Sequence, residues 1–178
     1  MKIAYLLLAT APMWAQAPLK PVIAPSSPER SAVSRTALTD LEGSLDSKLR
    51  AANDKDPFEV LGLTRGLYLQ GYGAVLTTEA SLIRTPIISP FKRTIGPEEA
   101  ARVHQRKLAN LPVLKKTMQA MWRDAALALT SIPDNEQVVL AVRVLYQPWE
   151  DTTGLPAQIL MKGPRKAALT GDIQTEEE

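Results

Sequence analysis

Cysteine is absent from the 178-residue chain, and histidine occurs only once. The missing cysteine excludes disulfide bonds, a thiol nucleophile and a cysteine-ligated metal. His104, the single histidine, has no second histidine with which to complete a zinc site. We therefore expect no metal, no cofactor and a disulfide-free domain that its hydrophobic core alone stabilises.

A hydrophobic run long enough to cross a bilayer is also lacking, since that takes about 20 apolar residues and the apolar segment Ile3–Ala11 is far shorter. Lys2 precedes this segment, and the small residues Ala15 and Ala17 follow it, as is typical of a secretory signal peptide. We expect residues 1–17 to be this signal, with cleavage after Ala15 or Ala17. The sequence thus predicts an exported protein, periplasmic or secreted, with no transmembrane segment once the signal is removed.

The chain also lacks a large net charge of either sign. Without Lys2, 20 basic residues stand against 19 acidic ones, a net charge of +1, which argues against a nucleic-acid-binding protein. The charges are nonetheless segregated, with a net +6 over residues 84–116 and −4 over residues 172–178. A solvated helix surface is the simple interpretation of the basic segment. The alternative is a surface for an acidic partner, with Arg102, Arg106 and Lys107 as candidate binding residues.

Composition divides the rest of the chain into three parts. Four prolines and three serines between residues 18 and 33 predict a disordered linker. The acidic residues 171–178 predict a disordered tail. Residues 34–170 remain for a single domain of ordinary size.

Hydrophobic periodicity predicts two helices in this domain. The first covers residues 36–53, where leucines at three- and four-residue spacing form one stripe and charged residues such as Glu42 and Asp46 fall on the other faces. The second covers residues 97–131, with a proline in its first turn and a break or kink at Asn110 and Pro112.

Alternating patterns predict two β-hairpins. The first joins strands at residues 60–70 and 74–83 through Gly71-Tyr72-Gly73. The second joins residues 137–146 to 157–162. Apolar residues on both faces of the segment 137–146 predict a central strand. The expected fold is an α+β two-layer sandwich, in which helices cover an antiparallel sheet of about four strands.

Charged residues inside the predicted strands are the first candidates for chemistry. Glycoside hydrolysis requires two carboxylates that face each other. Glu79 is a candidate for one of them, but the predicted strands contain no second acid. A cross-strand ion pair of Glu79 with Arg65 or Arg143 is the simpler interpretation. His104 lies on a helix face among cations, which predicts a residue at the edge of the core rather than a catalytic base.

The loop after the central strand offers a second set of candidates, Trp149, Glu150 and Asp151. A tryptophan beside two carboxylates is typical of a sugar- or peptide-stacking platform. The alternative is an aromatic plug over the end of the sheet with solvated acids beside it.

No catalytic constellation and no family motif is visible. The sequence therefore predicts an exported, non-enzymatic protein that binds a partner protein or a component of the cell envelope. The alternative is a carboxylate-dependent hydrolase or carbohydrate-active protein that uses Glu79, Glu150 or Asp151.

Overall fold

Three helices and six strands form the part of the chain that the computed structural model describes, residues 33–86 and 94–178. The described residues all belong to one compact unit, residues 31–178. The predicted signal peptide and all of the predicted linker except Val33 lie outside them. Val33 is buried in the core, so the domain begins inside the predicted linker boundary.

Helix α1 runs over Arg35–Ala51, within two residues of the predicted bounds. Ser34 caps its start, since the Ser34 hydroxyl oxygen accepts a hydrogen bond from the Ala37 backbone N–H at 3.1 Å. The predicted leucine stripe is buried and packs on the sheet; its members are Leu38, Leu41, Leu45 and Leu49. The periodicity of the sequence therefore locates both this helix and its inner face.

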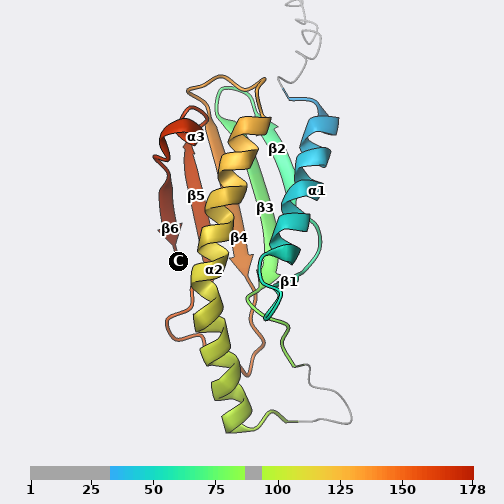
Figure 1. The fold of residues 1–178 in the computed structure, drawn as a ribbon, viewed down its shortest axis with the longest axis vertical. Coiled ribbons are helices and arrows are strands. Elements are labelled where there is room, and N and C mark those ends of the chain that lie inside the picture. The colour runs from blue at the N-terminus through green and yellow to red at the C-terminus, as the bar shows by residue number, and fades with distance from the viewer. Residues whose placement is uncertain (1–32, 87–93) are drawn as a thin grey trace, which may run out of the picture. The chain divides into compact units, whose positions relative to one another are not determined.

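Six strands make one mixed sheet, rather than the expected antiparallel sheet of about four (Figure 1). Both predicted hairpins are present, as β2–β3 and β4–β5. The expected central strand is β4, which lies between β3 and β5 with Val142 fully buried. The strand bounds are β1 Glu59–Val60, β2 Arg65–Leu69, β3 Gly73–Ser81, β4 Gln137–Val144, β5 Gln158–Pro164 and β6 Gln174–Glu177.

The two hairpins join in parallel, which corrects the all-antiparallel prediction. β3 pairs with β4 in parallel, with Gly73 opposite Gln137 at the start of both strands. Among the described residues of the connection between the two strands there is one helix, α2 (Pro97–Ala128). Its 32 residues rise about 48 Å, enough to carry the chain back past the full length of β3 before β4 begins. One helical crossover between neighbouring strands makes them parallel.

Helix α2 continues through Pro112, where the sequence predicts a break or kink. Tertiary contacts hold the turn beside this proline. Asn110 is buried, and its side-chain amide donates to the Leu82 carbonyl at 2.6 Å and to the Asp56 carbonyl at 2.8 Å. The Asn53 amide donates in turn to the side-chain oxygen of Asn110 at 2.6 Å. These bonds favour the helical backbone at a point where local propensity opposes it.

The acidic C-terminal segment is ordered, which corrects the prediction of a disordered tail. After a short helix, α3 (Ala167–Thr170), the chain turns at Gly171 in the left-handed region and forms β6 against β5. All four residues of β6 are exposed, so their sequence carries no apolar signal. Backbone pairing with β5 and a 2.6 Å ion pair between Lys162 and Glu176 hold this strand.

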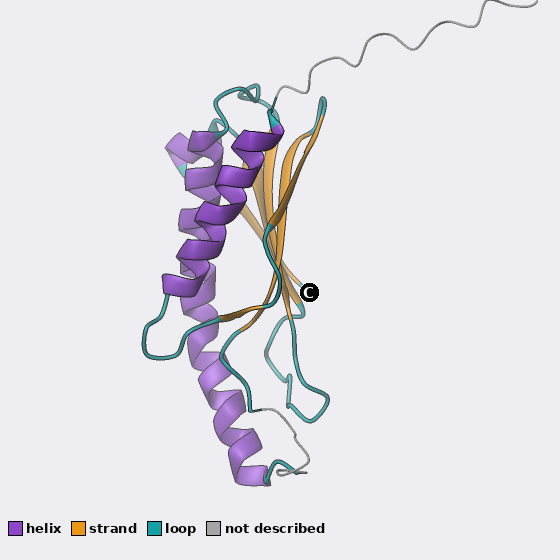
Figure 2. Ribbon diagram, turned by 90° about the vertical axis from the view of Figure 1, so that its right-hand side faces the viewer, coloured by secondary structure: helices purple, strands orange, loops and turns teal. Residues whose placement is uncertain are grey.

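Helices α1 and α2 lie on the same side of the sheet, α1 over β2 and α2 over β4 and β5 (Figure 2). The indole N–H of Trp122 ties α2 to β4 by donating to the Val138 carbonyl at 2.7 Å. No helix among the described residues is both long and apolar enough to span a membrane. The opposite side of the sheet carries neither helix, and we call it the open face.

Candidate functional site

The open face exposes leucine. Leu67 and Leu69 of β2 are 49% and 48% exposed, and Leu61 and Leu63 just before the strand are 39% and 56% exposed. The alternation of the sequence groups these four leucines on one side, and the structure turns that side outward. We call Leu61, Leu63, Leu67 and Leu69 the leucine strip.

Close packing against α1 explains why the leucines face outward. Gly66 lies on the inner side of β2, where a Cβ atom would come within 2.9 Å of the Leu76 side chain. The Gly66 N–H donates to the Glu42 carboxylate at 2.7 Å. A larger residue would not fit at position 66. The two leucines of β2 occupy outer positions on the strand, while Tyr68 on the inner side is partly buried against the core.

Two acids of α1 that were expected on solvated faces are buried and bind the backbone beside β2. Glu42 also accepts from Arg35 at 2.9 Å, and Arg35 donates to the Gly66 carbonyl at 3.0 Å, so both backbone groups of Gly66 are satisfied by α1 side chains. Asp46 accepts from the Thr64 N–H at 3.0 Å and from its hydroxyl at 2.6 Å. These bonds occupy backbone groups at the sheet edge that another strand would otherwise pair with.

The leucine strip borders a hollow of about 480 Å³ on the open face. Thr77 of β3 and Ala141 of β4 lie opposite each other in its floor. Its charged lining residues are Arg65, Glu79 and Arg143, the three charged strand residues that the sequence singles out. Arg143 pairs with Glu79 at 3.2 Å, which confirms the cross-strand interpretation with Arg143 as the partner. Within the described part of the chain, Arg65 has no ion-pair or hydrogen-bond partner.

Two of the other predicted site residues meet in the core. Lys107 of α2 and Glu150 of the β4–β5 loop form an ion pair whose side chains are 0% and 2% exposed. The second Glu150 oxygen accepts from the Gln147 N–H at 3.0 Å, and the Lys107 ammonium lies 4.9 Å from the centre of the Tyr146 ring. Sequence reasoning proposed both residues for unrelated sites, because 43 positions separate them. The pair fastens the loop to the helix.

The structure does not gather the remaining candidates into one site. Arg106 forms an ion pair with Asp56, and Arg102 lies 3.9 Å from Glu98 on an exposed helix face. The His104 ring nitrogen lies 2.9 Å from the Asp151 backbone carbonyl. Arg102, Arg106 and His104 therefore each contact a different part of the protein and do not form a common binding or catalytic site.

The predicted platform of Trp149, Glu150 and Asp151 is divided as well. Trp149 is half-buried, Glu150 is enclosed with Lys107, and Asp151 is exposed. Hydrogen bonds from Thr153, followed by the charge of His104, lower the pKa of Asp151. Only one of the two carboxylates therefore remains accessible beside the tryptophan.

Tyr146 should make the stability of the protein fall as the pH rises through the alkaline range. Burial, with the Glu150 charge as a second cause, raises the pKa of Tyr146 from 10.0 to about 12. The folded state keeps this proton between pH 10 and about 12 while the unfolded state loses it, so stability present below pH 10 is lost across that interval. We expect a steeper fall of the denaturation midpoint with pH in the natural protein than in Tyr146→Phe. Equal slopes in the two proteins would contradict this assignment.

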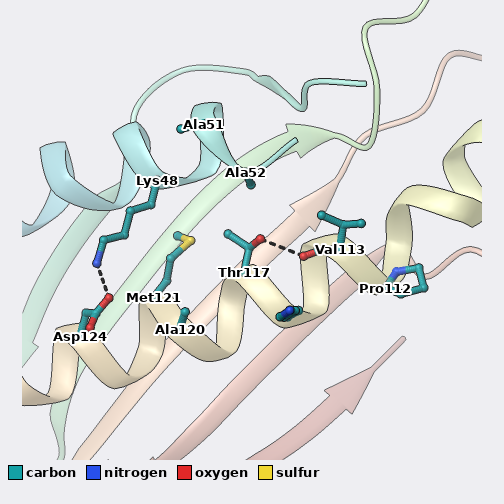
Figure 3. Close-up of a pocket in the computed structure, with 10 residues that line it drawn as sticks. Lys48, Ala51, Ala52, Pro112, Val113, Thr117, Ala120, Met121 and Asp124 are labelled. Atoms are coloured by element: carbon teal, nitrogen blue, oxygen red, sulfur yellow. Dashed lines mark hydrogen bonds and ion pairs between the residues drawn. The ribbon is translucent and has the colours of Figure 1, made fainter. Parts of the chain in front are cut away.

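A second hollow, of about 680 Å³, lies between α1 and α2 (Figure 3). Its walls are mainly small or apolar, including Ala51, Ala52, Val113 and Ala120. The ion pair of Lys48 with Asp124 links the two helices beside it. The small residues that open this groove give no chemical signal in the sequence, and the groove was not predicted.

The described residues contain no group of three or more histidine, cysteine, aspartate or glutamate side chains placed to hold a metal ion. Comparison with known proteins gives no match to any family model, curated protein or solved structure. The open face with its leucine strip is therefore the candidate site, on the strength of its own geometry.

Proposed function

We propose that this chain is an exported, non-enzymatic binding protein that contacts its partner through the open face. The observation that carries the proposal is the leucine strip, four leucines between 39% and 56% exposed on one side of a sheet. Single exposed leucines are common, but a contiguous apolar patch with a polar border is typical of an interaction surface.

The guarded edges of the sheet support binding through the face. At one edge, Glu42 and Arg35 occupy the outward backbone groups of Gly66. At the other edge, β6 is only four residues long and carries Glu176 and Glu177. Short, charged or covered edges disfavour the addition of a strand from another chain. A partner therefore has the face available to it and finds the edges obstructed.

The positions of the acidic residues support the non-enzymatic part of the proposal. Carboxylate catalysis requires two acids near one substrate in different environments. Glu79 is paired with Arg143 on the open face, whereas Glu150 is enclosed with Lys107 beneath a loop. The geometry gives the hydrolase alternative no observation in its favour.

The basic segment supports a partner other than nucleic acid. Among its cations, Lys107 is fully buried, Arg106 pairs with Asp56, and Lys115 pairs with Glu177 at 2.7 Å. A nucleic-acid surface needs accessible cations to replace counterions along the phosphates. In this domain, many of those charges are used within the molecule.

The test is expression of the full chain in a bacterial host, with a photo-cross-linking amino acid at position 67 or, as control, at position 127. Leu127 is also 46% exposed but belongs to α2. We expect the exported protein to have lost 15 or 17 residues by intact mass. A defined adduct should form at position 67, disappear with Leu63→Glu and be absent at position 127. Retention of Met1, or the same adducts from both positions, would contradict the proposal.

A further inference from the structure

We infer that the hollow beside the leucine strip binds a ligand with one carboxylate and an apolar chain. This inference rests on the proposed function and names the chemistry that the open face recognises. It starts from Arg65, which is exposed in the hollow and has no partner among the described residues, although the other charged groups there are paired.

Strand register brings two guanidinium groups to the same hollow. Arg65 lies opposite Thr77 on β3, and Thr77 lies opposite Ala141 on β4, two residues before Arg143. Strand spacing and rise place the Cα atoms of the two arginines roughly 12 Å apart on the same face. Two long side chains can converge on one small anion across this distance. Arg143 donates one hydrogen bond, at 3.2 Å, to Glu79, and its other N–H groups can donate to a ligand.

The charge count selects a single negative charge. Two arginines and one glutamate give the hollow a net charge of +1, which one carboxylate neutralises. A phosphate monoester would bring up to two negative charges and leave an excess beside Glu79. Guanidinium groups bind carboxylates through paired N–H donors, and the Thr77 hydroxyl in the floor is a further donor.

The border of the hollow selects an apolar chain. Leu61 and Leu63 line it, and the strip continues along β2 to Leu69. The segment that carries these leucines is fixed at both ends: the Leu61 N–H donates to the Glu79 carbonyl at 2.8 Å, and Thr64 is bound by Asp46. A wall held in this way needs little ordering when a ligand binds, which favours affinity.

Two sources share this chemistry, a fatty acid and the C-terminus of an apolar peptide. The probes are therefore dodecanoate against dodecanol, and acetylated trileucine with its carboxylate free against the same peptide amidated. Binding to protein purified from the exported fraction is measured by calorimetry. We expect at least one acid to bind about tenfold or more tightly than its neutral counterpart, because a hydrogen-bonded charge contributes that much. The acid that shows this preference identifies the source.

Substitutions then locate the site. Arg65→Gln should abolish the preference for the acid, whereas Arg123→Gln, which removes an exposed arginine of α2, should leave it unchanged. Acids and neutral probes of equal affinity, or a preference that survives Arg65→Gln, would overturn the inference and leave the cross-linking test of the proposed function unaffected. Absence of binding by every probe would also overturn it, and the adduct at position 67 would then decide the proposed function separately.

Discussion

The substitution Gly73→Ala is expected to lower the free energy of unfolding by about 4 kcal/mol or more, which is a large part of the stability of an ordinary domain. Gly73 has a φ of +135°, a backbone conformation that residues with a Cβ atom rarely adopt. A Cβ atom there would lie 1.8 Å from the Gln137 carbonyl oxygen. The obstacle is the backbone of the neighbouring strand, so the parallel pair β3–β4 would have to separate at its start.

Gly71 provides a matched control two residues away. It also has a positive φ, +77°, but a Cβ atom would meet nothing within 4 Å. Gly71→Ala should therefore lose only about 1 kcal/mol, the cost of a left-handed backbone with a side chain. Chemical denaturation followed by circular dichroism measures both variants. Equal losses at the two positions would show that β3 and β4 do not approach as described.

Removing the buried lysine is expected to have the second large effect. Lys107→Met leaves the Glu150 carboxylate enclosed without its cation, and breaking one side of a buried ion pair costs about 3–5 kcal/mol. The double variant Lys107→Met with Glu150→Leu should regain most of this loss, because it removes both charges. Thermal and denaturant unfolding of the single and double variants measures the difference.

A partly exposed ion pair between α2 and β6 provides the control. Lys115 and Glu177 are 2.7 Å apart, with side chains 32% and 39% exposed. Lys115→Met should cost at most about 1 kcal/mol, because solvent screens such a pair. If Lys107→Met lowers the free energy of unfolding no more than Lys115→Met does, the inference that burial makes the Lys107–Glu150 pair important for stability is wrong.

Local pattern by itself determined the elements whose signal lies within a few neighbouring residues. The leucine spacing located α1, the alternation located both hairpins, and the glycines at 71 and 73 located the first turn. The apolar residues on both faces of β4 placed it inside the sheet. Each of these features follows from the period of a helix or a strand, or from the conformations that glycine allows.

Tertiary structure decided which groups are buried and how the hairpins meet. The helical crossover made β3 and β4 parallel, and distant hydrogen bonds to Asn110 kept α2 helical through Pro112. Backbone pairing alone ordered β6, which the alternation of side chains could not reveal.

The candidate site depends on the tertiary structure even more strongly. Alternation grouped the leucines of residues 61–69 but could not say which side of β2 would face α1. The side of β2 that carries Gly66 faces α1, because Leu76 and Glu42 approach Gly66 too closely for a side chain to fit there. Likewise, Lys107 and Glu150 resemble solvated charges in the sequence and are enclosed because a loop folds over α2. Burial depends on contacts between residues far apart in the chain, and a local pattern carries no record of them.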